Sequence, residues 1–203
     1  MNELFVFPLN NSVLFKKVTL PYHIFEHRYR QMIKDAIEYN RPIAIAPFSP
    51  TGRYHDQICV AGHPHILNHY EDGRLDIYIT GSIKCKLKHL VSEKPYKIYT
   101  FEEIEERVFV NEDVEDNLDF LRELIDRWAF KYLEDEEQRM NFSRTLYDPE
   151  LLVNYSAVFL IDEINVKKDV MEAGNIKKKI QIILKSLGPK EVPLGPFMPA
   201  LRF

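Results

Sequence analysis

The sequence predicts an α+β protein in which a mostly β-stranded segment, interrupted by one early helix, precedes a helical segment. Two observations carry this prediction. Short apolar or alternating runs bounded by turn residues dominate residues 1 to 110, as is typical of strands. Beyond residue 111, apolar residues recur every three or four positions, which is the spacing of a buried helix face. We therefore divide the chain into a β domain at 1–110, a helical subdomain at 111–189 and a proline-rich tail at 190–203.

The first elements are predicted to be a strand, a helix and another strand. Residues 4–9 form a strand-like apolar run, and residues 42–48 form a second one. Between them a helix is predicted from Pro21 to Tyr39, because proline suits a first helical turn and apolar residues follow at helical spacing. The apolar stripe of this helix would consist of Phe25, Tyr29, Met32, Ile33, Ala36 and Ile37.

Further strands complete the predicted β domain. A strand beginning at Gln57 is predicted to continue to about Tyr70, with Pro64 marking a bulge or an edge position. Asp72-Gly73 supplies the positive φ angles of a tight hairpin turn before a strand at 75–80. A last strand is predicted at 95–101. Alternation in the strand that begins at residue 83 places Ile83, Cys85 and Leu87 inside and Lys84, Lys86 and Lys88 outside.

The predicted helical subdomain opens within an acidic stretch, because residues 102–137 contain 15 acidic and 4 basic residues. Asn111 is the predicted cap of its first helix. Further helices are predicted at 149–161, 165–172 and 176–187, and the apolar proline-rich tail is expected to dock on this chain or on a neighbour. The buried side of the first helix is predicted to be Val114, Leu118, Leu121, Ile125, Trp128 and Tyr132, widened by Phe120, Leu124 and Phe130.

Three stretches near the N-terminus carry a family resemblance. They are Phe7-Pro8-Leu9, Val13-Leu14-Phe15 and the run from Leu20 to Met32. Their order and spacing resemble the opening of the LON domain, which stands at the N-terminus of the ATP-dependent protease Lon and also occurs in stand-alone bacterial proteins. One departure is Lys16-Lys17, where the family usually has Pro-Gly. Further matches are Gly62, Asp72–Arg74, Ile79–Ser82, Cys85, Leu87 and Pro95–Tyr96.

This resemblance implies a fold and a function. The implied fold is a PUA-like β-pseudobarrel with one inserted helix, followed by a small α-helical bundle. The implied function is a non-catalytic binding module that recognises polypeptide segments or partner proteins. An exposed barrel edge beside a helical subdomain would offer a groove for an extended apolar peptide. The residues predicted to line this groove are Tyr22, Phe48 and Tyr54.

Composition narrows the class of protein. The net charge of −4 argues against a general nucleic-acid binder. The N-terminus lacks a basic segment before a long apolar run, and no run approaches the roughly 18 apolar residues of a membrane span. Cys59 and Cys85 fall in predicted strands and are expected to be buried free thiols, although their spacing alone neither requires nor excludes a bridge. We expect a soluble cytoplasmic protein, and the sequence leaves its oligomeric state open.

The sequence contains no motif of a familiar catalytic site. Walker A, Gly-x-Ser-x-Gly, His-Glu-x-x-His and Cys-x-x-Cys patterns are all missing from it. The resemblance implies that the ATPase and protease chemistry of Lon belongs to domains that these residues do not include. We therefore predict that the chain is not an enzyme and uses no cofactor and no metal.

Three alternatives remain open at this point. His23 and Glu26, three apart on the predicted helix, could transfer a proton in a small hydrolase, although scaffold contacts are the preferred interpretation. An RNA-binding PUA-like protein could use the outward lysines of the strand that begins at residue 83, although edge lysines more often block strand pairing. One strand face could bind zinc, although surface or half-buried histidines are the preferred interpretation. That face comprises Cys59, His63, His65 and His69.

Overall fold

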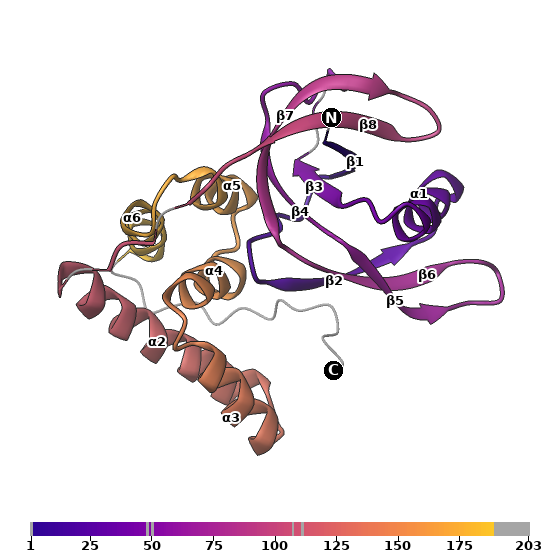
Figure 1. Cartoon of the computed structure of the whole chain (residues 1–203). Coiled ribbons are helices and arrows are strands. Elements are labelled where there is room, and N and C mark those ends of the chain that lie inside the picture. Colours follow the sequence, from indigo (N-terminus) through magenta and orange to yellow (C-terminus); the bar gives the residue numbers. More distant parts are fainter. Residues whose placement is uncertain (1, 48, 50, 107, 111, 189–203) are drawn as a thin grey trace. The chain divides into compact units, whose positions relative to one another are not determined.

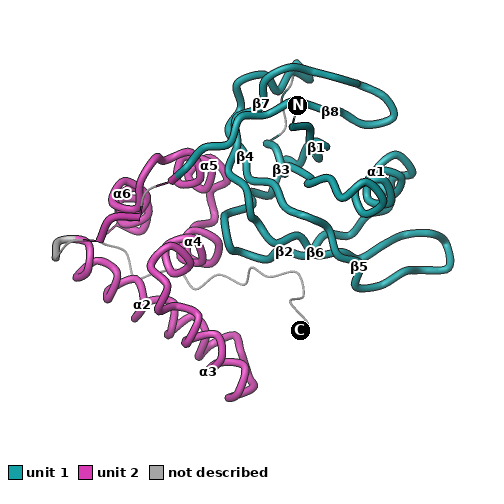
Figure 2. The backbone as a smooth tube through the Cα atoms, viewed as in Figure 1, with its two compact units in different colours: residues 1–105, 200–203 teal, residues 106–199 magenta. Residues whose placement is uncertain are grey.

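In a computed structural model of the protein, residues 2–47, 49, 51–106, 108–110 and 112–188 are described. The chain divides into two compact units (Figure 2): the barrel unit runs from residue 1 to Glu105, and the helical unit begins at Glu106. The fold class is α+β, as the sequence predicts. The tail at 190–203, with its predicted docking, lies outside the described residues. Among the residues that are described, no helix is both long and apolar enough to cross a membrane.

Five strands of the barrel unit close into a barrel (Figure 1). They are β1 (Glu3–Leu9), β3 (Ile43–Pro47), β4 (Ile58–Gly62), β7 (Ile83–Ser92) and β8 (Lys97–Glu103), hydrogen-bonded in that order. β1 pairs in parallel with β3 and antiparallel with β8, so the first strand of the chain closes the ring. The closure therefore depends on pairing between residues about 95 positions apart in the sequence, such as Glu3 with Thr100.

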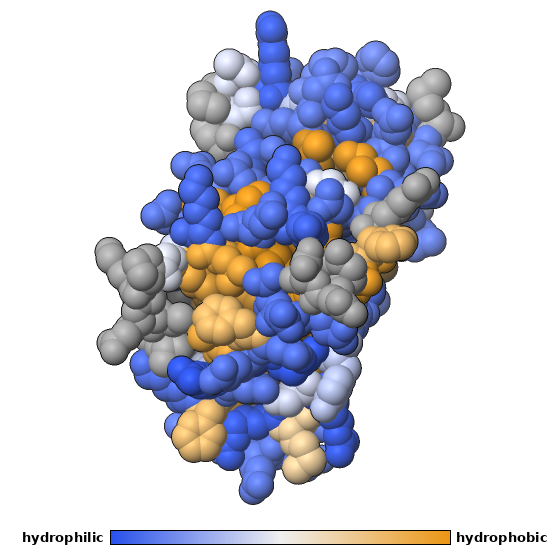
Figure 3. Space-filling view, turned by 90° about the vertical axis from the view of Figure 1, so that its left-hand side faces the viewer, coloured by the Kyte–Doolittle hydropathy of each residue, from blue (hydrophilic) through white to orange (hydrophobic). Residues whose placement is uncertain are grey.

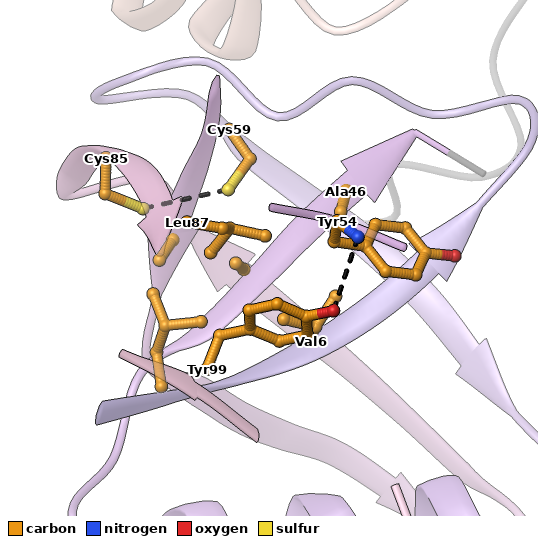
Figure 4. Close-up of a cluster of buried hydrophobic side chains, with 10 residues drawn as sticks. Val6, Ala46, Tyr54, Cys59, Cys85, Leu87 and Tyr99 are labelled. Carbon is orange, nitrogen blue, oxygen red and sulfur yellow. Dashed lines mark hydrogen bonds between the residues drawn. The ribbon is translucent and has the colours of Figure 1, made fainter. Parts of the chain in front are cut away.

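The barrel interior is filled by every second side chain of its strands, because side chains alternate across a strand. Cys59 of β4 and Cys85 of β7 face each other in register, and their sulfur atoms lie 3.7 Å apart (Figure 4). Both are buried free thiols, as the sequence predicts. The interior cluster consists of Leu4, Val6, Ala44, Ala46, Tyr54, Cys59, Ala61, Cys85, Leu87 and Tyr99.

A second sheet has the strand order β2-β6-β5, with bounds Thr19–Ile24 for β2, Pro64–His69 for β5 and Leu75–Thr80 for β6. β5 and β6 form the predicted hairpin, and Gly73 in its turn has a φ of 82°. The helix α1 (His27–Glu38) packs on β1 and β5. Its buried side consists of Tyr29, Met32, Ile33 and Ala36, which are four of the six predicted residues.

The predicted helix start at Pro21 is wrong. Residues 19–24 instead form β2, which pairs antiparallel with β6 along its whole length. Proline is tolerated there because β2 is an edge strand of its sheet. As a result α1 begins six residues after Pro21, and Phe25 lies before the helix with 64% of its surface exposed. Ile37, also predicted to be on the buried stripe, is exposed.

The single strand predicted from Gln57 to Tyr70 is in fact two strands, β4 and β5, in different sheets. The chain crosses from one sheet to the other at Gly62 and His63. A β-carbon on Gly62 would lie 2.0 Å from the carbonyl oxygen of Thr80, so only glycine allows this close approach of two backbones. Pro64 begins β5, which is an edge strand.

The helical unit contains α2 (Glu112–Tyr132), α3 (Glu136–Thr145), α4 (Pro149–Leu160), α5 (Ile164–Glu172) and α6 (Ile176–Leu187) in the part of the chain that is described. Asp148 caps α4 by accepting hydrogen bonds from the backbone N–H groups of Glu150 and Leu151. Asn175 caps α6 in the same way. The sequence predicts α2, α4, α5 and α6 but gives no sign of α3. On α2, the predicted seam is buried from Val114 to Trp128 but only half-buried at its last residue, Tyr132. Phe120 and Phe130 are exposed rather than part of it.

Two kinds of side-chain contact hold the helical unit together. Aromatic rings stack between α2 and α4, with 4.1 Å between the ring centroids of Trp128 and Phe159, and also within α4, with 5.4 Å between those of Tyr155 and Phe159. The Lys179 ammonium of α6 lies 3.1 Å from a carboxylate oxygen of Glu106, and the two side chains are only 6% and 4% exposed. A buried ion pair of this kind is costly to break, because the remaining charge would stay buried without this counter-ion.

Candidate functional site

A pocket of about 1330 Å³ opens in the barrel unit at the C-terminal end of β1, and we call it the β1 pocket. Four separate segments form its walls. They are the end of β1 with the following turn (Val6–Asn11), the junction of β2 and α1 (His23–Glu26, with Arg28 and Tyr29), the loop containing Ser49, Gly52 and Tyr54, and the turn before β8 (Glu93–Lys97). The pocket therefore exists only because the fold brings together residues spread over 91 positions of the chain.

The base of the β1 pocket is aromatic. The Phe7 ring lies 4.6 Å from the Tyr29 ring and 6.3 Å from the Tyr22 ring, measured between centroids. Phe7 points away from the barrel interior because its neighbour Val6 points into it. Tyr22 does not line the pocket itself but supports Phe7 from behind. The Tyr22 hydroxyl is in turn paired with the hydroxyl of Ser12 at 3.2 Å.

Tyr54 forms the wall that the pocket shares with the barrel interior. Its side chain is 2% exposed, and its hydroxyl accepts a hydrogen bond from the backbone N–H of Ser49 at 3.4 Å. Its own backbone N–H donates to the Tyr99 hydroxyl at 3.3 Å (Figure 4). Tyr54 is therefore held by hydrogen bonds at both its hydroxyl and its backbone N–H. It stabilises the fold and also forms part of the pocket wall.

The turn before β8 is tied to α1. The Tyr96 ring meets the Phe5 ring edge to face at 4.9 Å, and the Tyr96 hydroxyl donates a hydrogen bond to the Asp35 carboxylate. This contact fixes the far wall of the β1 pocket. The pocket is accordingly bounded by rigid elements on the sides of Tyr54 and Tyr96.

Phe25 stands at the rim of the β1 pocket and is its most exposed large apolar side chain among the described residues. The neighbouring His23 ring lies nearly parallel to it, with 6.4 Å between centroids. His23 is held by a 2.6 Å hydrogen bond between its Nδ1 and Asp76, which also accepts one from the Tyr70 hydroxyl. These hydrogen bonds, that of His23 first, hold the pKa of Asp76 below its usual value.

The charged residues of the pocket are largely paired with one another. Arg28 contacts Glu26 at 2.9 Å, and Lys97 contacts Glu93 at 2.9 Å. Arg28 also lies over the Tyr29 ring at 4.6 Å. These acidic and basic groups neutralise one another. The pocket therefore combines an apolar base with a rim whose positive and negative charges are paired. Such a lining favours an apolar ligand group over a strongly charged one.

The structure places the predicted site residues at different positions relative to the β1 pocket. Tyr54 lines the β1 pocket, Tyr22 lies behind it, and Phe48 is outside the described residues. His23 and Glu26 both line the pocket, but they are not a pair on one helix, because His23 belongs to β2 and Glu26 precedes α1. The sequence offers Phe25 only as a helix-stripe residue, so its exposure at the pocket rim is not foreseen.

The candidate zinc face does not assemble. Cys59 is inside the barrel, whereas His65 and His69 are exposed on β5. A register shift between Ile66 and Asn68 breaks the strand parity on which that hypothesis depends. Within the described ranges, no group of three or more His, Cys, Asp or Glu side chains is placed to hold a metal ion.

The helical unit has exposed apolar residues of its own. Figure 3, which shows the side of the molecule on the left of Figure 1, has apolar side chains gathered near its middle between hydrophilic borders. Phe120 and Phe130 are exposed on α2, where a shallower pocket of about 580 Å³ is lined mostly by charged residues. Among its described lining residues Phe130 is the one aromatic side chain, so the β1 pocket is the stronger candidate.

Comparisons with known proteins agree on one family. The model of the substrate-binding domain of ATP-dependent protease La (LON) matches residues 3–188. The N-terminal domain of the Lon protease of Mycobacterium avium complex has a TM-score of 0.70 at 14% identity, over 91% of this chain and 97% of that chain. A Lon N-terminal domain protein from Xanthomonas campestris has a TM-score of 0.66 at 13% identity, over 89% and 96%. No curated protein matches the chain.

Proposed function

The chain belongs to the family of Lon substrate-binding domains, and from this premise we propose that it recognises extended polypeptide segments, of unfolded or partner proteins, without transforming them. The family consists of substrate-recognition modules, and membership in it supports a binding role in general. The proposed binding site is the β1 pocket. The cytoplasmic location expected from the sequence is part of the same proposal.

The single observation that supports this site is Phe25. Its aromatic side chain is 64% exposed beside an aromatic base and between charges that pair with one another, so an apolar ligand group bound in the pocket would cover it. Aromatic side chains that become fully covered in a complex are among the residues that most often dominate binding energy. An apolar side chain of a bound polypeptide would fill the space between Phe25 and Phe7.

The test is the affinity for reduced and carboxymethylated lactalbumin, which stays unfolded, measured by fluorescence anisotropy. We expect Phe25→Ser to weaken binding about tenfold or more, as loss of an aromatic anchor does. The matched control is Leu67→Ser, which removes a similarly exposed apolar side chain from β5 outside the pocket. Failure of the wild-type protein to bind, or equal losses in both variants, would overturn the proposal.

The RNA-binding alternative depends on Lys84, Lys86 and Lys88. Lys84, predicted to face outward, is only 2% exposed. Lys86 pairs with Asp56 at 2.9 Å and Lys88 with Glu102 at 2.6 Å. These lysines are therefore poorly placed to contact phosphates, and we expect no salt-sensitive retention on heparin.

The hydrolase alternative depends on proton transfer between His23 and Glu26. Each of these residues has another partner, since His23 is hydrogen-bonded to Asp76 and Glu26 to Arg28. Both pairs are consistent with scaffold contacts at the pocket rim. We therefore assign these residues to the shape of the β1 pocket and not to catalysis.

A further inference from the structure

β1 is longer than the strand that covers one of its edges. Its antiparallel pairing with β8 ends at Val6, opposite Lys97. Its parallel pairing with β3 continues to Leu9, opposite Pro47. Among the described residues, Phe7–Leu9 thus have a strand partner on the β3 side only, and all three line the β1 pocket. In the described part of the chain, the pocket therefore contains an uncovered strand edge.

The direction of the backbone groups on this edge follows from two hydrogen bonds. The N–H of Phe5 donates to the carbonyl of Pro42, on the β3 side, at 3.1 Å. The carbonyl of Asn2 accepts from the N–H of Phe101, on the β8 side, at 3.3 Å. Because backbone groups alternate along a strand, odd-numbered residues face β3 and even-numbered residues face β8. The carbonyl of Pro8 therefore faces the uncovered side.

Proline at position 8 gives this edge a particular chemistry. It has a carbonyl acceptor but no N–H donor, so the edge can accept a hydrogen bond there and cannot donate one. Proline in a strand is typical of an edge that is not paired within the fold. A ligand that matches the edge must therefore supply a hydrogen-bond donor, and the main-chain N–H of a polypeptide in extended conformation is such a donor.

We propose that a bound polypeptide adds a strand along Phe7–Leu9, in the place that β8 leaves free beyond Lys97, with one of its N–H groups donating to the Pro8 carbonyl. This inference rests on the proposed function and states how the β1 pocket holds its ligand. Side chains of the added strand would alternate between the side of Phe7 and Tyr29 and the side of Tyr54. The interior of a helical segment does not fit this edge, because its N–H groups are used internally.

The alternation of backbone groups provides the test. The probe is the tightest-binding decapeptide of an array that covers the lactalbumin sequence, and each of its N–H groups is N-methylated in turn. In an added strand only alternate N–H groups face the protein. We expect methylation to weaken binding about tenfold or more at one position or at positions two apart, and about twofold or less at the residues between them.

The outcomes separate this inference from the proposed function. A parent decapeptide that fails to bind contradicts the proposed function itself. A parent that binds, with losses that are uniformly small or uniformly large along the peptide, leaves the proposed function intact and overturns strand addition. A loss confined to one N–H group, or to N–H groups two positions apart, supports it.

A protein variant locates the strand at β1. Pro8→Ala supplies the missing N–H, which a carbonyl of the added strand can accept, so binding should tighten about two- to tenfold. The control is Pro47→Ala on β3, outside the pocket, which should leave the affinity within about twofold. Unchanged or weaker binding by Pro8→Ala would place the added strand at another edge and overturn the assignment to β1. Thermal unfolding of both variants confirms that they are folded.

Discussion

The barrel unit and the helical unit are stabilised in different ways. In the barrel unit, backbones of distant residues lie against one another, as where Gly81 approaches the carbonyl oxygen of Phe15. In the helical unit, the decisive contacts are between side chains, such as the Trp128–Phe159 stack and the Lys179–Glu106 ion pair. The stability of the barrel unit should therefore fall most when a side chain is enlarged at a close backbone contact. The stability of the helical unit should fall most when a side-chain contact is removed. The candidate site belongs to the barrel unit, where close contacts between backbone segments hold the chain in place.

The largest effect is expected at the buried ion pair. Lys179→Met leaves the Glu106 carboxylate buried without this counter-ion, and the free energy of unfolding of the helical unit should fall by about 3–5 kcal/mol. Trp128, the single tryptophan, is buried in this unit and reports its urea unfolding by fluorescence. The matched control is Lys178→Met, one residue away and exposed. A loss below about 1 kcal/mol would contradict the side-chain account of this unit.

A double variant sharpens the same prediction. If Glu106→Leu is added to Lys179→Met, no unpaired charge of the pair remains buried. Much of the lost stability should then return, because replacing a buried ion pair with apolar groups is often nearly neutral. Urea unfolding followed by Trp128 fluorescence measures the recovery. A double variant less stable than Lys179→Met alone would show that Glu106 acts mainly through other contacts.

An added methyl group should have its effect in the barrel unit. The β-carbon of Gly81→Ala would lie 2.2 Å from the carbonyl oxygen of Phe15, so two backbone segments must separate. We expect a loss of about 1–3 kcal/mol in the free energy of unfolding, with barrel amides exchanging hydrogen faster. The control is Gly174→Ala in the helical unit, where no atom lies within 4 Å of the new β-carbon. Equal effects of the two changes would remove the distinction between the units.

A smaller gain is expected at Lys17. This residue has a φ of 64°, in the left-handed region that glycine adopts without strain. Lys17→Gly relieves roughly 1–2 kcal/mol of backbone strain and adds roughly 0.5–1 kcal/mol of unfolded-chain entropy, so stability should rise by about 0.5 kcal/mol. Lys16 has no positive φ, so Lys16→Gly relieves no strain and should instead lower the stability. Calorimetric melting temperatures compare the two.

The smallest effect concerns pH. His23 and then Tyr70 lower the pKa of Asp76, so the stability that these hydrogen bonds contribute is present above the unfolded-state pKa of about 3.9. It is lost as the pH falls through the lower folded-state pKa. His23→Gln should raise the pKa of Asp76 more than Tyr70→Phe does, as NMR titration of the carboxyl carbon would show. The reverse order would contradict the leading role of His23.

Local signals account for the elements that the sequence predicts well. The hairpin turn at Gly73 and the Asp148 cap of α4 each depend on a few neighbouring residues, and both are present. The family resemblance supplies the barrel topology, which strand periodicity alone does not produce. The fold class and the family could accordingly be read from the sequence.

The errors arise where distant partners decide the structure. Residues 19–24 satisfy the start signal of a helix at Pro21, yet pairing with β6 makes them a strand. α3 has no buried residues, so no apolar periodicity could reveal it. The β1 pocket is assembled from four segments, and only their approach in the fold shows that Phe25 stands at its rim. A property that depends on such an approach is not contained in any one stretch of sequence.

Glu106 has a practical consequence for anyone who divides this polypeptide. Its carboxylate binds the ammonium of Lys179, which lies 73 positions further along the chain. The helical unit therefore includes a residue that precedes its first helix. A fragment that starts at residue 111 would omit that carboxylate and should be difficult to purify in folded form. A cut upstream of Glu106 keeps the helices with the acid that they need.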